Sequence, residues 1–374
     1  HSNGGLGGSS TADLASATQG SGRFVVKLPY TVTRWRMRFR NRDLNWTAKN
    51  AAVLKQLVVG RHARTMTGAA GETGSFVDSA ATTVVSTDQP IPGDGTWGPW
   101  LPWVDSAGDV FEAGTEFLVA FGYTFSPSTA VQTGAGKCWH WTNSTSATNP
   151  AIAGSGATIR YIPFDWTIEY DVTTRNKVSL IVGDSISEGI TGSDSTQEPT
   201  SLWQGPFQLW AARTGRCLVN LSLAGISLQA LALANDIGNY AWQRQGDLAQ
   251  IPIDEVIISA GSNDMFRTSG ARNVAQMQGD LDIIRTRLAG YGITAPIYMS
   301  TILARGTGTG VNTRPLYHDW LASRPSWVTD IIDFDAATRG FNATSILDAY
   351  TCDNIHPSRY GCVAMADQLT AVLP

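Results

Sequence analysis

Two short motifs in the second half of the chain carry residues that can perform nucleophilic chemistry. Val178-Ser-Leu-Ile-Val-Gly183-Asp184-Ser185 predicts a buried strand that runs into a tight turn and presents a serine. Asp353-Asn-Ile-His356 lies close to the C-terminus. A serine needs a base to become a nucleophile, and the base needs a carboxylate to orient it. The two motifs together therefore indicate a serine hydrolase.

Two further turns follow predicted strands between these motifs. They are Asn220-Leu-Ser-Leu-Ala-Gly225 and Ser259-Ala-Gly-Ser-Asn263-Asp264. Because ligands bind at the carboxyl ends of strands in open α/β sheets, we expect the turns to converge at one edge. Acyl transfer needs donors aimed at a developing oxyanion. The amides of Ser185 and Gly225 and the side chain of Asn263 are the candidates.

These blocks carry a family resemblance. Gly183-Asp184-Ser185-Ile186, Gly225, Gly261-Ser262-Asn263-Asp264 and Asp353-x-x-His356 resemble, in order and spacing, the four blocks of SGNH (GDSL-type) hydrolases over about residues 177–374. Ile186 departs from the usual Thr or Leu without touching the chemistry. The resemblance implies a flavodoxin-like three-layer α/β/α domain and ester hydrolysis without a metal or cofactor.

The resemblance also implies a role for each site residue. Ser185 is the expected nucleophile, His356 the base and Asp353 the acid that orients it. Ser185, Gly225 and Asn263 form the expected oxyanion hole. Each residue also has a purely structural alternative: Ser185 as a turn serine, Asp353 and His356 in a solvated loop, and Gly225 and Asn263 as ordinary turn or capping residues. The presence of all four blocks argues against these alternatives.

The sequence pattern changes near residues 175–177. From there apolar runs alternate with helix-like segments, which predicts an α/β layer with a mostly parallel sheet. The predicted strands are Val178–Val182, Cys217–Leu221, Glu255–Ser259, Pro296–Ser300 and Val328–Phe334. The predicted helices are Ser201–Arg213, Leu228–Ala234, Ala271–Leu288 and Ser358–Val372.

The earlier part of the chain predicts mainly strands. Residues 1–22 indicate a flexible tail or linker. Residues 23–172 predict a β-sandwich (jelly-roll-like) accessory domain, before a hydrolase domain at 173–374. Trp35, Met37 and Phe39 alternate with arginines, which predicts one buried and one solvated face. Only 48–58 shows a helical period in this part.

Three tryptophans lie within seven residues, in Trp97-Gly-Pro-Trp100-Leu-Pro-Trp103. Aromatic faces stack on sugar rings, so Trp97, Trp100 and Trp103 are candidate substrate-binding residues. The alternative is that the rings fill a hydrophobic core or an interface. The sequence leaves both open.

Composition excludes some classes of protein. The chain has 374 residues, is 43% hydrophobic and 16% charged, and carries a net charge of −4. No stretch predicts a membrane span, and the charge gives no reason to expect nucleic acid as a partner. Low charge with many small polar residues is common in extracellular bacterial proteins, so we expect a secreted, cell-surface or phage-virion protein. Cys352 and Cys362 bracket the Asp353/His356 loop, and a disulfide between them is one of two open alternatives.

The sequence thus predicts an esterase acting on short-chain (acetyl) esters of a polysaccharide or cell-envelope glycan. A lipase or small-ester hydrolase is the alternative within enzymes. A glycan-binding protein with an inactive hydrolase domain is the alternative from another class. The oligomeric state stays open.

Overall fold

A computed structural model gives the fold, which divides into two units by its internal contacts. The structure describes residues 19–28, 31–41, 51–63, 76, 81–105, 111–125, 133–141, 158–172, 174–190, 205–243, 248–267, 270–305, 309–341, 344–351 and 353–374. One unit comprises His1–Arg175 and Thr196–Ser201, and the other comprises Asn176–Ser195 and Leu202–Pro374. The division of the chain into domains at 23–172 and 173–374 stays a prediction.

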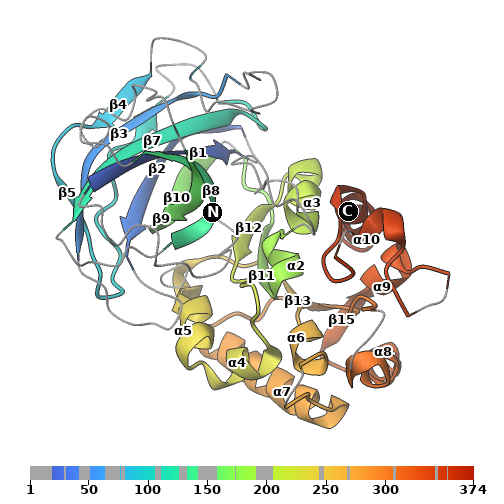
Figure 1. The fold of residues 1–374 in the computed structure, drawn as a ribbon. Coiled ribbons are helices and arrows are strands. Elements are labelled where there is room, and N and C mark those ends of the chain that lie inside the picture. Colours follow the sequence, from blue (N-terminus) through green and yellow to red (C-terminus); the bar gives the residue numbers. More distant parts are fainter. Residues whose placement is uncertain are drawn as a thin grey trace. The chain divides into compact units, whose positions relative to one another are not determined.

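The first unit contains two antiparallel sheets (Figure 1). One has the order β4-β3-β7-β1-β8-β9, with β5 also paired to β3, and the other has the order β10-β2-β6. The strands are β1 (Gln19–Lys27), β2 (Val32–Arg40), β3 (Ala52–Arg61), β4 (Thr82–Val85), β5 (Gln89–Ile91), β6 (Val104–Asp105), β7 (Glu116–Phe125), β8 (Thr133–Trp141), β9 (Thr158–Pro163) and β10 (Asp165–Val172). The weak helical period at 48–58 is misleading, because its described part belongs to β3, where valines pair with β7.

Buried aromatic rings join the two sheets. Phe24 of β1 stacks on Trp166 of β10 with ring centroids 4.9 Å apart. Trp35 of β2 lies 5.5 Å from Phe117 of β7, and Phe39 lies 6.2 Å from Phe121. The predicted inward face of β2 is therefore correct, since Trp35, Met37 and Phe39 are all buried.

The arginine face of β2 is covered by tryptophans, whereas the sequence predicted a solvated face. Trp97 lies over Arg38 and Arg40, at 5.0 and 4.4 Å from ring centroid to guanidinium carbon. Trp100 lies over Arg36 and Arg38, and Trp103 over Arg34 and Arg36, at distances of 4.4 to 5.1 Å. We call this interleaved set of four arginines and three tryptophans the Arg–Trp ladder.

Backbone bonds set the spacing of the ladder. The amides of Gly98 and Leu101 donate to the carbonyls of Phe39 and Met37, both at 2.9 Å. Three residues of the tryptophan segment thus advance by two residues of β2, so each indole falls between two arginines. Acidic residues directly opposite on β10 complete the cover: Asp171 pairs with Arg34, Glu169 with Arg36 and Asp165 with Arg40.

The second unit is built around a five-stranded parallel sheet with the order β12-β11-β13-β14-β15. Numbered from β11, this is the 2-1-3-4-5 order of flavodoxin-like folds. The strands are β11 (Val178–Gly183), β12 (Cys217–Asn220), β13 (Glu255–Ser259), β14 (Ile297–Ser300) and β15 (Val328–Ile332). The helices are α2 (Ser185–Glu188), α3 (Pro206–Thr214), α4 (Leu228–Leu233), α5 (Asp236–Gln243), α6 (Ser262–Met265), α7 (Val274–Gly290), α8 (Thr313–Ala322), α9 (Phe334–Thr338) and α10 (Arg359–Val372), with 3₁₀ turns η4 (Leu248–Gln250), η5 (Thr309–Val311) and η6 (Asp348–Tyr350).

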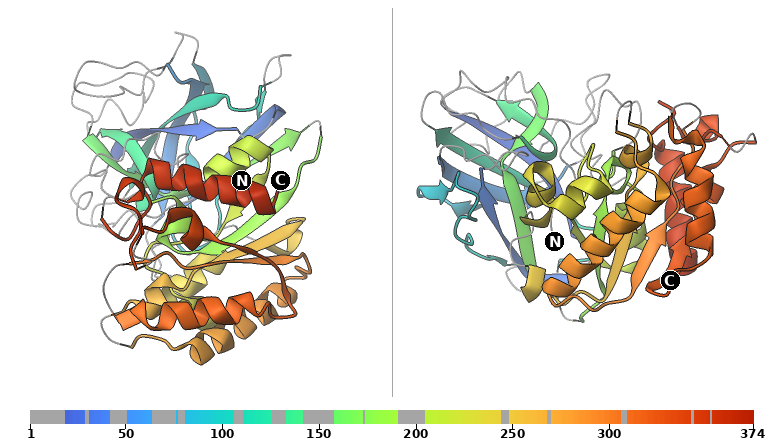
Figure 2. Two further views of the ribbon diagram at one scale, coloured as in Figure 1. Left: turned by 90° about the vertical axis from the view of Figure 1, so that its right-hand side faces the viewer. Right: turned by 90° about the horizontal axis from the view of Figure 1, so that it is seen from below.

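Helices cover both faces of this sheet. Figures 1 and 2 show α3 and α10 on one side of the sheet and α4 and α7 on the other. The α3/α10 side buries one continuous core that includes Ile181, Ile257, Trp210, Met365 and Leu369. Among the described residues, no helix has both the length and the apolar character needed to cross a membrane.

We expect Arg38→Lys to destabilise the first unit by about 1 kcal/mol, because lysine keeps the charge but loses the planar stack against Trp97 and Trp100. Urea unfolding followed by tryptophan fluorescence measures the change. Arg61→Lys, at an exposed position on β3, is the matched control. Equal midpoints for the two variants would contradict a stabilising role of the ladder.

Candidate active site

The turn that presents Ser185 is shaped by close packing. Gly183 ends β11, and Asp184 caps α2 by accepting a hydrogen bond from the Ile186 amide at 3.1 Å. A Cβ on Gly183 would lie 2.5 Å from Ser187 Cβ and 2.7 Å from the Ser259 carbonyl oxygen. Only glycine fits between the turn and β13, so the nucleophile candidate is held directly against the neighbouring strand.

Asp184 is a buried carboxyl at this turn. Burial raises its pKa to about 6, while the Ile186 amide and the charges of Arg305 and His356 act in the opposite direction. Asp184 thus places an ionisable group next to Ser185. Sequence reasoning assigned this carboxyl group no role of its own.

Ser185, His356 and Asp353 form a continuous chain of hydrogen bonds. The Ser185 hydroxyl lies 2.9 Å from His356 Nε2, and His356 Nδ1 lies 2.7 Å from Asp353 Oδ2. With the proton on Nδ1 facing the carboxylate, Nε2 accepts from the serine hydroxyl. This is the geometry that a serine nucleophile, its base and an orienting acid require.

The three-residue spacing of Asp353 and His356 works because the acid folds its own loop. Asp353 Oδ1 accepts hydrogen bonds from the backbone amides of Ile355 and His356, at 2.9 and 2.7 Å. Partial burial alone would raise the pKa of Asp353, but hydrogen bonds from the His356 ring and from these amides outweigh it and lower the pKa. The carboxylate therefore stays ionised opposite the imidazole.

The loops of Gly225 and Asn263 are tied together. The Asn263 side-chain amide donates to the Ile226 carbonyl oxygen at 2.8 Å, which uses one of its two N–H donors. Gly225 has a φ of +76°, and a Cβ added there would meet no atom within 4 Å. The Leu223 amide donates to the Gly183 carbonyl at 3.2 Å, so this loop adjoins the serine turn.

Asp264 joins this region to the start of α4. Its carboxylate accepts from the amides of Leu228 and Gln229 at the start of α4, at 2.8 and 3.2 Å. Burial raises the pKa of Asp264 to about 6, and these two amide bonds oppose that shift. Asp264 therefore caps the start of α4 and not its own helix.

Other predicted residues lie elsewhere. Trp97, Trp100 and Trp103 belong to the first unit, where they are half-buried in the Arg–Trp ladder, so they do not fill its core. Their role in substrate binding stays a prediction. Cys362 is a buried free thiol, and the disulfide suggested with Cys352 involves a residue outside the described ones. Within the described ranges, no group of three or more His, Cys, Asp and Glu side chains is arranged to hold a metal ion.

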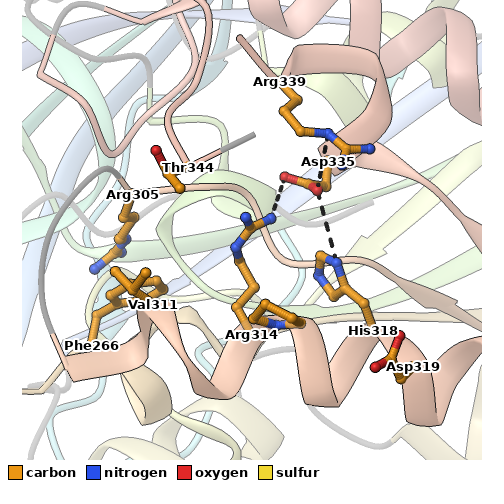
Figure 3. Close-up of a pocket in the computed structure, with 10 residues that line it drawn as sticks. Phe266, Arg305, Val311, Arg314, His318, Asp319, Asp335, Arg339 and Thr344 are labelled. Atoms are coloured by element: carbon orange, nitrogen blue, oxygen red, sulfur yellow. Dashed lines mark ion pairs between the residues drawn. The ribbon is translucent and has the colours of Figure 1, made fainter. Parts of the chain in front are cut away.

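Sequence reasoning missed Arg305. It follows β14 by five residues at the edge where the other site segments meet, and its side chain lines a cavity (Figure 3). The rule that places ligands at the carboxyl ends of parallel strands applies to β14 as it does to β11, β12 and β13. Applied to all five strands, it would have drawn attention to this arginine.

Comparisons with known proteins find structural neighbours alone. No family model matches the chain, and no curated protein sequence does. A putative lipolytic protein of the G-D-S-L family from Desulfitobacterium hafniense is 17% identical, with 53% of this chain and all of that chain covered and a TM-score of 0.40. A family two carbohydrate esterase from Clostridium thermocellum, in complex with cellohexaose, is 13% identical over 100% and 97% of the two chains, with a TM-score of 0.44.

A third neighbour is a carbohydrate esterase family 2 enzyme plus carbohydrate-binding domain from Corynascus thermopiles (Myceliophthora fergusii). It is 14% identical, covers 95% of this chain and 94% of that chain, and has a TM-score of 0.41. These three neighbours are thus a G-D-S-L lipolytic protein and two carbohydrate esterases. At these identities and TM-scores we rest the function on the geometry of the site.

We expect Asn263→Ala to lower kcat for p-nitrophenyl acetate by about 10²–10³-fold, because it removes one candidate donor to the oxyanion. Thermal unfolding of the same variant provides the control, since losing the bond to Ile226 costs only about 1 kcal/mol. A kcat close to that of the wild type would show that Asn263 serves the loop and not the reaction.

We expect Gly183→Ala to destabilise the second unit by about 1–3 kcal/mol, because its methyl group collides with Ser187 and Ser259. Gly279→Ala is the matched control: it lies in α7, a Cβ there meets nothing within 4 Å, and alanine should stabilise the helix by about 0.5–1 kcal/mol. Urea unfolding of both variants measures the difference. We expect the free energy of unfolding to fall in Gly183→Ala and to rise in Gly279→Ala. A change in the same direction for both variants would argue against close packing at the turn.

Proposed function

We propose that the chain is a serine esterase that hydrolyses short-chain, acetyl-type esters on a polysaccharide or cell-envelope glycan. The observation that carries the proposal is the unbroken chain of hydrogen bonds from Asp353 through His356 to Ser185, at 2.7 and 2.9 Å. In such an arrangement, the imidazole takes the hydroxyl proton while the serine oxygen attacks a carbonyl carbon.

The reaction then proceeds in two halves. His356 Nε2 accepts the Ser185 proton as the new C–O bond forms, and returns it to the alcohol oxygen as the ester C–O bond breaks. The acyl group stays on Ser185 until water attacks, with His356 again taking and returning one proton. The Asp353 carboxylate stabilises the imidazolium at each stage.

Three donors are proposed to stabilise the negative charge on the carbonyl oxygen. Ser185 is the first residue of α2, so its amide has no acceptor within the helix. Gly225 supplies a second backbone amide, and Asn263 has one N–H beyond the one that binds Ile226. Each such donor is typically worth about 3–4 kcal/mol of barrier.

The small acyl group is proposed from the cavities near the site. The described residues beneath the serine turn enclose about 20 Å³, enough for little more than a water molecule. A larger cavity of about 360 Å³ is lined in part by charged side chains. The charged part of the larger lining suits a small or polar group better than a long acyl chain, so we prefer the short-chain ester to the lipase alternative.

The glycan part of the proposal rests on the motif resemblance and on the β-rich first unit. We assign that unit as a β-sandwich accessory domain and place the protein outside the cell. A glycan-binding protein with an inactive hydrolase domain is the alternative from another class. The aligned Ser185 and His356 favour the enzyme.

We expect Ser185→Ala to lower the rate of p-nitrophenyl acetate hydrolysis by at least about 10⁴-fold, because the nucleophile is lost. Ser323→Ala, an exposed serine at the end of α8, is the control. Equal rates for Ser185→Ala and the wild type would reject the esterase. Acetate release from acetylated polysaccharides, compared with esters of longer chains, tests the substrate, and a preference for long chains would favour the lipase.

A further inference from the structure

A cavity of about 360 Å³ adjoins the proposed active site in the second unit (Figure 3). Its size falls in the range of small-molecule sites. Phe266, in its wall, follows Asn263 by three residues, and Arg305 follows the segment 300–303, which lines the small space beneath Asp184. The cavity therefore lies at the same edge of the sheet as the catalytic candidates.

One side of this cavity is a closed ion-pair cluster. Asp335 lies 2.6 Å from Arg314, 3.5 Å from Arg339 and 3.8 Å from His318. Figure 3 shows these three side chains converging on the one carboxylate. The negative charge of Asp335 is thereby shared among these groups, and with Asp319 also in the lining, Arg314 and Arg339 are balanced by two carboxylates. Arg305 is then the cationic side chain of the lining that this cluster does not neutralise.

Arg305, on the other side of the cavity, has a different environment. Among the described residues it makes no ion pair, and its buried Nε has no hydrogen-bond partner. Its guanidinium carbon lies 5.2 Å from the centre of the Phe266 ring. Stacking on an aromatic face holds a guanidinium in place while its donors, which lie in the plane of the group, stay available.

Arg305 is partly buried without a direct counter-ion among the described residues. Burial lowers the pKa of Arg305, and the carboxylates of Asp184 and Asp353 oppose this from a distance without a direct contact in the described residues. A guanidinium that is partly removed from water and lacks a direct counter-ion gains most from a ligand that brings one.

We propose that this cavity binds a carboxylate or phosphate group of the substrate through Arg305, so that the ester presented to Ser185 is carried on an acidic glycan. The statement that the glycan carries an ester rests on the proposed esterase function. The binding of an anion by Arg305 does not depend on it. A carboxylate or phosphate offers two oxygens to the planar donors of a guanidinium, which fixes orientation as well as affinity. Arg305 thereby becomes a specificity-determining residue.

Binding of small anions tests the site without any catalysis. Calorimetric titrations of the full chain use D-glucuronate, inorganic phosphate and, as the neutral probe, D-glucose. We expect at least one anion to bind more tightly than glucose, and Arg305→Gln to weaken that binding about 10- to 100-fold, as expected for a lost hydrogen bond to a charged group. Arg213→Gln, which removes an exposed charge on α3, should bind as the wild type does.

The arms of this titration separate the sources of the anion. Tighter binding of glucuronate indicates a sugar acid, and tighter binding of phosphate indicates a phosphorylated glycan. If neither anion binds more tightly than glucose, or if Arg305→Gln binds the anion as well as the wild type, the proposal is overturned. Should Arg305→Gln fail to fold, Arg305→Lys replaces it, because lysine keeps the charge but loses the two-point contact.

A second measurement separates anion binding from an electrostatic effect on Asp353. The ratio of kcat/KM for an acetylated acidic polysaccharide to that for an acetylated neutral one should fall in Arg305→Gln. An equal loss on both substrates would make Arg305 a support of the catalytic acid and reject the specificity role. Failure of the esterase itself would appear separately, as equal rates for Ser185→Ala and the wild type.

Discussion

The absence of a side chain at Gly183 is the constraint on which the candidate site depends. It lets the end of β11 pack directly on Ser187 and Ser259, so the turn that carries Ser185 has one position relative to the sheet. Short polar bonds then extend this order along the edge: Ser187 Oγ donates to the Ser259 carbonyl at 3.0 Å, and Asn220 donates to the Ser187 carbonyl at 3.0 Å. The oxyanion candidates Ser185, Gly225 and Asn263 lie in the loops that follow these strands. Their placement therefore depends on the packing beneath the serine.

The acidic residues of the second unit are used in three distinct ways. Asp353 is solvated enough, and hydrogen-bonded well enough, to stay ionised beside His356. Both carboxylate oxygens of Asp264 accept hydrogen bonds from amides at the start of α4, and they join two loops of the site. Asp335 gathers three cationic or basic side chains in the wall of the adjoining cavity. The same functional group therefore orients a base, caps a helix and neutralises arginines, depending only on which donors face it.

Sequence patterns predicted the second unit better than the first, for a physical reason. Strands buried on both faces are continuous apolar runs, and Glu255–Ser259 was predicted with the bounds that the structure gives. In the first unit, several strands were not predicted individually, β8 among them, because glycines and mixed polar residues hide the strand period in Thr133–Trp141. The arginines of β2 appeared solvated because their cover comes from a segment some sixty residues away, roughly the separation of Arg38 and Trp100. Motif spacing predicted that Asp353 and His356 lie with Ser185. Arg305 belongs to no short motif and emerges only from the fold.

The position of His356 has a consequence for how the serine can lose its base. The histidine lies between η6 and α10, and α10 is held by its apolar contacts with α3 and by a bond from Trp210 to the Leu373 carbonyl oxygen. Ser185, in contrast, is fixed to the parallel sheet through the turn that follows β11. A change that loosens α10 from α3 would therefore move the imidazole away from Ser185 while the sheet and the serine turn keep their fold. The packing of one pair of helices thus decides whether the serine has its base.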